Sequence, residues 1–322
     1  MLQYNRRNRC GGELLRHNFQ AESMKTVKIK AYAKVNLTLE IVGQTAEYHS
    51  LDSLVASVDL YDLIVLKARK DKLSSVTMKG LGSESIPPEQ NNALKAAESF
   101  SKAFGVNGAD ITVYKNIPMG AGLGGSSADA SGVLNGMAKL YGVDDSEKIA
   151  ELADTLGSDT RYMLSGGFAR MQGRGGELTP VQSDAVLHFL AFCPKDGCSS
   201  GACYREYDRL TTRNGDGSYT QTAINALLQK DMQTLGKSLT NDLFLPATGL
   251  CESVKTAYEQ AQSFSPLGAV MTGSGSCVLA MFETKELCEW AQSRYRGKFR
   301  TIVLKTLVPS AIKKWRNPFV LD

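Results

Sequence analysis

The 322-residue chain has no long hydrophobic run. No stretch approaches the roughly 18 to 20 uninterrupted apolar residues that a bilayer-spanning helix needs, so we expect no membrane partner. The chain also lacks a strong charge of either sign, because 37 Lys and Arg residues stand against 33 Asp and Glu residues. A net charge of +4 does not indicate nucleic-acid binding, which favours dense basic faces with interleaved aromatic residues.

The spacings typical of disulfide frameworks and zinc sites are also missing. The seven cysteines are an odd number scattered along a long chain, which argues against a disulfide framework. Cys193, Cys198 and Cys203 are five residues apart, unlike the C-x2-C spacing of zinc sites, and His188 is the only histidine nearby. The sequence therefore predicts free thiols in a reducing compartment, and we expect a cytoplasmic protein.

Residues 1–23 lack the apolar core of about 7 to 15 residues that a secretory signal contains. They are rich in Arg and Asn, but they have little Ser and contain two acidic residues, which is unlike a transit peptide. Met24 begins a strand-like pattern. We interpret residues 1–23 as a disordered extension.

Hydrophobic periodicity predicts both strands and helices in the first half of the chain. Alternation of apolar and polar residues predicts strands within 26–42, 60–66 and 110–115. Helical spacing predicts helices over 91–104, 126–141 and 147–156. Glycines within 167–180 predict a hairpin.

The second half also mixes the two types of element. We predict strands over 186–192 and 299–307, and a turn that leads into a buried strand over 270–282. We predict helices over 222–228, 250–261 and 286–295, and a loop over 197–203. Because strict β-α-β alternation is missing, the pattern favours an α+β fold over a doubly wound sheet. We place a domain boundary within 181–186, which divides residues 24–184 from residues 185–322.

The strongest local feature is the segment Asn116-Ile-Pro-Met-Gly-Ala-Gly-Leu-Gly-Gly-Ser-Ser-Ala-Asp129, between a predicted strand and a predicted helix. Its four glycines let backbone amides approach a ligand closely, and the helix that follows adds the positive end of its dipole. Such a site suits phosphate groups. It is not a Walker A loop, because Ser126 and not lysine follows Gly125. The alternative is a glycine turn that only lets helix and strand pack.

Because this loop contains no lysine, the charge that neutralises a bound phosphate must come from elsewhere. The candidates are Lys34, within the first predicted strand, and Lys115, just before the loop. Taken alone, Lys34 is typical of an edge-strand lysine or of one whose head group reaches solvent.

The segment Pro118-Met-Gly-Ala-Gly-Leu-Gly-Gly-Ser-Ser-Ala128 resembles the ATP-binding signature of the GHMP kinases, which include galactokinase, homoserine kinase, mevalonate kinase and phosphomevalonate kinase. Ala33-Lys-Val-Asn-Leu37 resembles the N-terminal substrate motif of the family, and Thr272-Gly-Ser-Gly-Ser-Cys277 resembles its C-terminal glycine motif. The likeness extends from about residue 26 to residue 305. Within the family, Tyr48-His49 and Leu156-Gly-Ser-Asp159 are most similar to a kinase of the non-mevalonate isoprenoid pathway.

The resemblance implies a fold, a reaction and a set of ligands. The fold would join an N-terminal ribosomal-protein-S5-like α+β domain to a C-terminal ferredoxin-like domain, with the site between them. The reaction would be phosphoryl transfer from ATP, with Mg2+, to an alcohol that carries a cytidyl diphosphate group. The enzyme would be a monomer or a homodimer.

The resemblance also implies residue roles. Lys34 and Asp159 match the catalytic pair, and Asn36, Tyr48 and His49 match substrate contacts. Asp159 would accept the proton of the acceptor hydroxyl or orient that hydroxyl, and Lys34 would stabilise the developing charge. The predicted ATP-binding residues are Pro118, Met119, Gly120, Ala121, Gly122, Leu123, Gly124, Gly125, Ser126, Ser127, Ala128 and Lys115. Gly273, Ser274 and Gly275 would support this loop, and Ser127 would be a ligand of Mg2+.

The chain departs from the isoprenoid kinases at two places. Gln44-Thr-Ala-Glu47 stands where those enzymes usually show Arg-x-Asp-Gly, and Thr160-Arg161 stands where they usually have Val-Pro. Both departures flank the acceptor pocket and leave the acceptor open. The alternatives are another GHMP kinase that acts on homoserine or a mevalonate-type alcohol, and a non-catalytic ligand sensor with this fold. Tyr48 and His49 favour the cytidyl acceptor.

Overall fold

The computed structural model describes residues 25–45, 48–80, 87, 91–210, 215–307 and 320–321. The extension expected over residues 1–23 lies outside these ranges, as do Ala46 and Glu47 of the atypical segment before Tyr48. Within the described ranges, no helix is long and apolar enough to cross a membrane.

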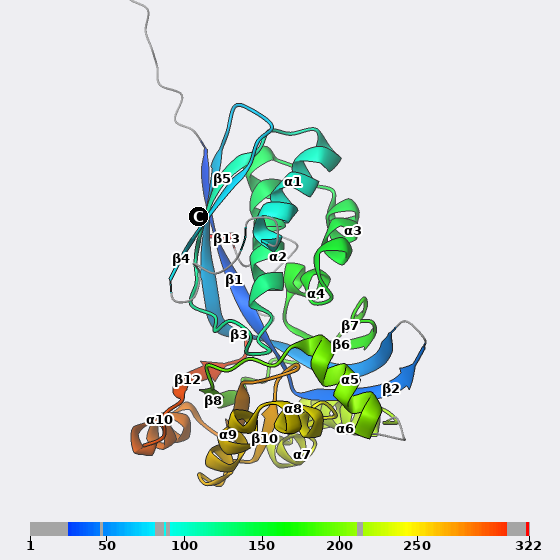
Figure 1. The fold of residues 1–322 in the computed structure, drawn as a ribbon, viewed down its shortest axis with the longest axis vertical. Coiled ribbons are helices and arrows are strands. Elements are labelled where there is room, and N and C mark those ends of the chain that lie inside the picture. The colour runs from blue at the N-terminus through cyan, green and yellow to red at the C-terminus, as the bar shows by residue number, and fades with distance from the viewer. Residues whose placement is uncertain are drawn as a thin grey trace, which may run out of the picture.

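A nine-stranded sheet forms the upper part of the molecule and extends into the middle (Figure 1). Its strands are β1 (Thr26–Asn36), β2 (Thr38–Gln44), β3 (His49–Ala68), β4 (Ser75–Lys79), β5 (Ala109–Tyr114), β6 (Phe168–Gly173), β7 (Glu177–Pro180), β9 (Thr240–Asn241) and β13 (Val320–Leu321). The 20-residue β3 pairs antiparallel with β1, β2, β5 and β6, and so joins most of the sheet. Its residues 60–66 were predicted as a strand, and the observed strand is three times as long.

Four helices lie on one side of this sheet (Figure 1). They are α1 (Asn92–Phe104), α2 (Gly125–Tyr141), α3 (Ser146–Leu156) and α4 (Thr160–Ser165). Three of them pack against its strands, and α3 packs against the other helices. The side chain of Asn91 caps α1 by accepting the amides of Ala93 and Leu94, and Gly105 ends the helix in the left-handed conformation. Glycine in α2 allows close packing, since a Cβ atom on Gly136 would lie 2.4 Å from Leu66 Cδ1. The predicted helix over 91–104 is confirmed.

The second half forms a four-stranded antiparallel sheet in the order β10-β11-β8-β12. These strands are β8 (His188–Cys193), β10 (Gly268–Met271), β11 (Val278–Phe282) and β12 (Arg300–Lys305). Helices connect β8 to β10, and α10 (Lys285–Arg294) connects β11 to β12, so the connectivity is the β-α-β-β-α-β pattern of ferredoxin-like domains. The predicted α+β fold class is confirmed.

The segment between β8 and β10 contains α5 (Ser200–Leu210), α6 (Ser218–Gln229), α7 (Met232–Lys237), α8 (Phe244–Leu250) and α9 (Glu252–Gln262). The loop predicted over 197–203 is wrong from Ser200 onward, because α5 begins there. The Cys-, Gly- and Ser-rich composition obscured this helix, although Cys203 and Tyr207 are buried one helical turn apart. The short helices α7 and α8 and the half-exposed strand β4 were not predicted either.

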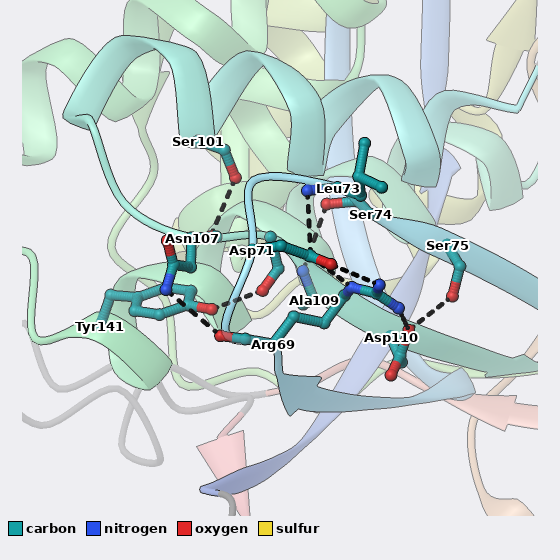
Figure 2. Close-up of polar contacts among 11 residues, drawn as sticks. Arg69, Asp71, Leu73, Ser74, Ser75, Ser101, Asn107, Ala109, Asp110 and Tyr141 are labelled. Atoms are coloured by element: carbon teal, nitrogen blue, oxygen red, sulfur yellow. Dashed lines mark hydrogen bonds and ion pairs between the residues drawn. The ribbon is translucent and has the colours of Figure 1, made fainter.

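A surface network of hydrogen bonds and ion pairs lies at the end of β3 that is farther from the four-stranded sheet (Figure 2). Arg69 contacts Asp71 with two nitrogens at 2.8 Å and Asp110 with a third at 2.7 Å. Ser75 donates a further hydrogen bond to Asp110. The network therefore ties the β3–β4 turn to the start of β5.

Candidate active site

A cavity of about 460 Å³ is lined by residues from both halves of the chain. It brings together most of the residues that the sequence predicted for the site: Lys34, Asn36, Lys115, all of 118–127, Asp159, Gly273, Ser274 and Gly275. Ala128 does not line it and is buried within α2. Tyr48 and His49 also lie outside the lining, and His49 reaches the cavity through a neighbouring ring that is described below.

The predicted phosphate loop favours glycine at two positions, both because φ is positive and, at Gly122, because another backbone lies very close. A Cβ atom on Gly122 (φ +75°) would lie 1.9 Å from the carbonyl oxygen of Thr272, and one on Gly124 (φ +71°) would lie 2.3 Å from Met163 Cε. Gly124 is the N-cap of α2, and no described side chain caps that end of the helix. The first amides of this 17-residue helix are therefore available to an anion.

The C-terminal glycine turn supports the phosphate loop through backbone contacts. The amide of Cys277 donates to the carbonyl of Ala121 at 3.2 Å, and Thr272 Oγ1 donates to the carbonyl of Gly122 at 3.3 Å. Asn241 fixes the turn from behind, because its Nδ2 donates to the carbonyls of Met271 and Gly273 at 2.6 and 2.8 Å. Two segments far apart in the sequence thus form one wall of the cavity.

Lys34 and Asp159 form an ion pair at the cavity, with 3.3 Å between Lys34 Nζ and Asp159 Oδ2. The β1–β3 register is irregular between Tyr32 and Lys34, the kind of feature that can change the direction of a neighbouring side chain. Asp159 occupies the N-cap position of α4 but makes no capping hydrogen bond to that helix. Its carboxylate is 24% exposed against 6% for the Lys34 side chain, so the pair is accessible from the aspartate side.

Asn36 holds the ammonium group of Lys34 in place. Lys34 Nζ donates to Asn36 Oδ1 at 2.6 Å, and Asn36 Nδ2 donates to Ser53 Oγ at 2.8 Å. The backbone amide of Asn36 donates to Thr272 Oγ1 at 3.0 Å, which links β1 to the C-terminal glycine turn. All these groups are buried, so the position of the lysine is well defined.

Lys115 lines the cavity, but its ammonium group is engaged by two aspartates that the sequence reasoning missed. Its Nζ lies 2.6 Å from Asp129 Oδ2 and also contacts Asp62. Burial raises the pKa of Asp129 to about 7, against the opposing effect of the Lys115 charge. Burial by itself would lower the pKa of Lys115, but the charges of Asp129 and Asp62 outweigh it and the pKa is raised. No signal in the sequence links Asp62 to Lys115, since 53 residues separate them.

The hydroxyl groups at the start of α2 have different surroundings. Asn92 Nδ2 donates to Ser126 Oγ at 2.9 Å and thereby ties α1 to the loop. Ser127 lies beside Gly157, where a Cβ atom would be 3.1 Å from Ser127 Oγ. Asn91 and Asn92 both line the cavity and were not predicted as site residues.

Aromatic rings connect His49 to the cavity. The ring of His49 stacks on Tyr204 of α5 with 4.8 Å between centroids, and Tyr204 lines the cavity. Asp208, one helical turn further along α5, lies 2.6 Å from His49 Nε2. Burial, with a smaller contribution from the charge of Asp159, raises the pKa of the Tyr204 hydroxyl to about 12. Tyr204 and Asp208 escaped prediction because α5 was taken in part as a loop.

Tyr48 carries a cation on its face. The guanidinium of Arg174, in the β6–β7 turn, lies 5.1 Å from the centroid of the Tyr48 ring. The ring is 36% exposed. Arg174 was not predicted as a site residue, although it lies within the predicted hairpin.

One of the two departures from the isoprenoid kinases faces away from the cavity. Thr160 is completely buried, and Arg161 forms an ion pair with Asp154 of α3; neither residue lines the cavity. In the other departure, Gln44 donates to Asp208 Oδ1 at 3.1 Å and so contacts the same aspartate as His49.

Family profiles match both halves of the chain. The profile of the GHMP kinases N terminal domain matches residues 91–169, and that of the GHMP kinases C terminal domain matches residues 223–299. These ranges contain the phosphate loop, Asp159 and the C-terminal glycine turn.

Curated relatives share about a third of their residues with this chain. A 4-diphosphocytidyl-2-C-methyl-D-erythritol kinase of Caldicellulosiruptor saccharolyticus is 32% identical over 86% of this chain and 96% of its own length. A protein of Cutibacterium acnes with the same name is 31% identical over 80% of this chain and 87% of its own length.

Solved structures share the fold. A crystal structure of 4-(cytidine 5'-diphospho)-2C-methyl-D-erythritol kinase superposes with a TM-score of 0.71 at 27% identity, covering 86% of this chain and 98% of that one. A homoserine kinase from Cytophaga hutchinsonii superposes with a TM-score of 0.69 at 17% identity, covering 89% of this chain and 96% of that one. The second likeness concerns the fold alone.

Proposed function

The chain belongs to the GHMP kinase family, and from this premise we propose that it transfers the γ-phosphate of ATP to a hydroxyl of 4-diphosphocytidyl-2-C-methyl-D-erythritol. As a member of a kinase family, it is an ATP-using phosphotransferase with an alcohol acceptor. The finer proposal, the identity of the acceptor, is supported by the names of the relatives. It would place the enzyme in the non-mevalonate route to isoprenoid precursors.

The observation that carries the proposal is the Lys34–Asp159 pair, 3.3 Å apart, on the same cavity as the glycine loop. Phosphoryl transfer depends mainly on positioning and on stabilising charge. A non-catalytic sensor has no chemical need for a carboxylate held against a buried ammonium group, so the pair favours an enzyme.

Each member of the pair has a distinct task in the proposed reaction. The carboxylate of Asp159 accepts the proton of the acceptor hydroxyl, or orients that hydroxyl in line with the γ-phosphorus. The ammonium of Lys34, held by Asn36, stabilises negative charge that develops on the attacking oxygen and on the transferred group. Because Lys34 is 6% exposed, this stabilisation acts with little screening by water.

We propose that the amides at the start of α2 bind the phosphates of ATP, and that Mg2+ accompanies them. The residues fit an ion brought in by the nucleotide: Ser127 offers a hydroxyl at the cavity, and the described residues contain no group of three or more His, Cys, Asp or Glu side chains arranged to hold a metal. Mg2+ is usually bound through substrate phosphates and few protein ligands. When bound, it would neutralise phosphate charge.

The aromatic end of the cavity suits the cytidyl diphosphate group. In the proposed complex, Tyr48 and Tyr204 offer rings on which a pyrimidine can stack, and His49, fixed by Asp208, offers a ring nitrogen for a hydrogen bond. Arg174 adds a positive charge beside Tyr48 that suits a diphosphate.

The direct test is release of ADP by the purified protein with a panel of acceptors. We expect rapid turnover with 4-diphosphocytidyl-2-C-methyl-D-erythritol and background rates with homoserine, mevalonate or no acceptor. Turnover with homoserine or mevalonate instead would replace the acceptor but keep the kinase. ATP binding without turnover on any acceptor would favour the sensor.

The base-binding role of Tyr48 can be tested with a closely matched tyrosine. Tyr48→Ala should raise KM for the cytidyl substrate several-fold and leave KM for ATP unchanged, because the ring contacts only the acceptor. Tyr114→Ala is the control, since Tyr114 is also exposed and also has a cation on its face, Lys79 at 5.3 Å. It lies at the end of β5, whereas Tyr48 directly precedes His49, whose ring stacks on the cavity-lining Tyr204. Equal effects of the two variants would remove Tyr48 from this role.

A further inference from the structure

Cys193 and Cys277 lie directly opposite one another on neighbouring strands. Antiparallel pairing of β8 with β11 places Phe192 opposite Val278, and the next pair in the same register is Cys193 with Cys277. Their sulfur atoms are 3.3 Å apart, and both residues are buried free cysteines. Opposed residues in antiparallel strands have Cα separations of about 4.5 to 5.5 Å, within the range of about 4.4 to 6.8 Å that disulfides use.

Each of these cysteines continues into a segment that contacts the phosphate loop. The backbone amide of Cys277 donates to the carbonyl of Ala121. Four residues after Cys193, Gly197 packs on Gly120 so closely that a Cβ atom on Gly197 would lie 2.9 Å from the Gly120 carbonyl oxygen. The two cysteines therefore belong to two segments that both support the same loop.

We propose that Cys193 and Cys277 are a disulfide-forming site, oxidised by hydrogen peroxide, whose closure weakens the binding of ATP. The Cys193 thiolate attacks one oxygen of the peroxide, the O–O bond breaks, and a sulfenic acid forms with release of water after proton uptake. The Cys277 sulfur then attacks this sulfur, the S–S bond forms, the S–O bond breaks and a second water leaves. Two thiols and one hydrogen peroxide thus give one disulfide and two waters.

The pKa directions of the two thiols indicate different roles for them in the proposed oxidation. A hydrogen bond from the Cys277 thiol lowers the pKa of Cys193, against burial, and the charge of Arg300 adds to this effect. The same contact and complete burial raise the pKa of Cys277. Cys193 is therefore the residue that forms the thiolate and attacks the peroxide, and Cys277 is the one that closes the bond.

In the proposal, closure shifts the ends of β8 and β11 that support the loop. The sulfur atoms have to approach from 3.3 Å to the covalent distance of about 2.05 Å. Because Cys277 also holds Ala121 and the segment after Cys193 holds Gly120, the shift displaces the amides that we assign to the phosphates. The predicted loss is in affinity for ATP and not in affinity for the acceptor.

The test exposes the reduced full-length protein to hydrogen peroxide, blocks the remaining thiols and digests it without reductant. Mass spectrometry should find the peptides of Cys193 and Cys277 linked and lighter by two hydrogen atoms. The Kd for ATP, measured without acceptor, should rise several-fold and return to its starting value with dithiothreitol. Cys193→Ala should abolish both changes. Cys288→Ala, which removes another fully buried cysteine on α10, should abolish neither.

Three results would overturn the proposal: linkage of other cysteines in place of this pair, linkage of this pair with unchanged Kd for ATP, or the same loss of affinity in Cys193→Ala. The linkage itself is read in the wild type and does not depend on the folding of any variant. The proposal rests on ATP binding by this kinase but on no particular acceptor. A reduced protein that binds no ATP would therefore contradict the proposed function and not the disulfide site.

Discussion

In one surface cluster and one buried cluster of the described residues, a basic side chain lies between two aspartates. In the exposed cluster, Arg69 contacts Asp71 and Asp110 (Figure 2), and the three side chains are 28%, 51% and 44% exposed. Hydrogen bonds from Arg69 lower the pKa of both aspartates. Water surrounds these charges, so the attraction between them is screened.

In the buried cluster, Lys115 contacts Asp62 and Asp129, and the three side chains are 4%, 0% and 5% exposed. Here burial raises the pKa of Asp129 to about 7, although a cation lies next to it. The Oδ1 atom of Asp129 has no hydrogen-bond partner among the described residues. The two clusters contain the same kinds of charge. At the surface the arginine stabilises the ionised form of both aspartates, whereas inside the protein the loss of solvation at Asp129 outweighs the charge of Lys115.

The two clusters also differ in what they hold. The exposed cluster ties a turn to a strand at the outer end of the sheet. In the buried cluster, Asp62 Oδ1 accepts the backbone amides of Asn116 and Ile117 at 2.5 and 2.9 Å, at the point where β5 enters the phosphate loop. The buried charges therefore hold the backbone at the start of the proposed nucleotide site, whereas the exposed ones lie away from it.

The largest expected difference between the clusters is in stability. Lys115→Ala leaves two buried carboxylates without a cation and should cost roughly 3 to 5 kcal/mol of the free energy of unfolding. Arg69→Ala leaves its aspartates in water and should cost much less. Urea denaturation of both variants without nucleotide measures the difference, and equal losses would contradict the comparison.

A smaller effect is expected on nucleotide binding. Asp62→Asn keeps the size of the side chain but weakens its hold on the two loop amides and on Lys115, so KM for ATP should rise several-fold with kcat retained. Asp71→Asn is the matched variant in the exposed cluster and should change neither constant. Steady-state kinetics at saturating acceptor separates KM from kcat. A fall in kcat alone would show that Asp62 does not act by positioning the loop.

A further difference between the clusters is in the dependence of stability on pH. Because the pKa of Asp129 is raised from 3.8 to about 7, the folded state keeps a proton that the unfolded state loses. This contribution is fully present below pH 3.8 and is lost as pH rises through about 7. For Asp71 the pKa is lowered, so its contribution is present above pH 3.8 and is lost as pH falls.

Two variants test these opposite dependences of stability on pH. The stability of the wild type minus that of Asp129→Asn should fall between pH 4 and pH 7, within the window that the raised pKa of Asp129 sets. The corresponding difference for Asp71→Asn should stay constant in that window and shrink at lower pH. Denaturation curves across this range measure both. A constant difference for Asp129→Asn would contradict the raised pKa of Asp129 in the folded protein.

The sequence predicted those parts of the fold that depend on local pattern. Asn91 and Gly105 bound α1 where capping chemistry places them. Four glycines indicated a loop whose backbone a ligand approaches closely, which stays a prediction; the close neighbour of Gly122 in the structure is Thr272. The resemblance to the GHMP kinases then supplied the Lys34–Asp159 pair, which periodicity and composition alone do not single out.

What could not be predicted depends on contacts between distant residues. Asp62 is an ordinary acidic residue in a strand until the fold brings it to Lys115. Tyr204 was missed because the composition around it is typical of a loop. Its helix buries Cys203 and Tyr207 in the hydrophobic cluster that also contains Phe192 of the four-stranded sheet. Cys193 and Cys277 are 84 residues apart in the sequence, and their proximity depends on the register in which β8 pairs with β11.

The most direct test of the account is phosphoryl transfer by Asp159→Asn, measured together with its affinity for ATP. If the carboxylate handles or orients the acceptor hydroxyl, transfer to the cytidyl substrate should fall by about 10²- to 10⁴-fold, while Kd for ATP stays near that of the wild type. Asp154→Asn, which alters a surface aspartate paired with Arg161, should leave both unchanged. Transfer by Asp159→Asn within a few-fold of the wild type would contradict the assignment of the Lys34–Asp159 pair as the catalytic centre.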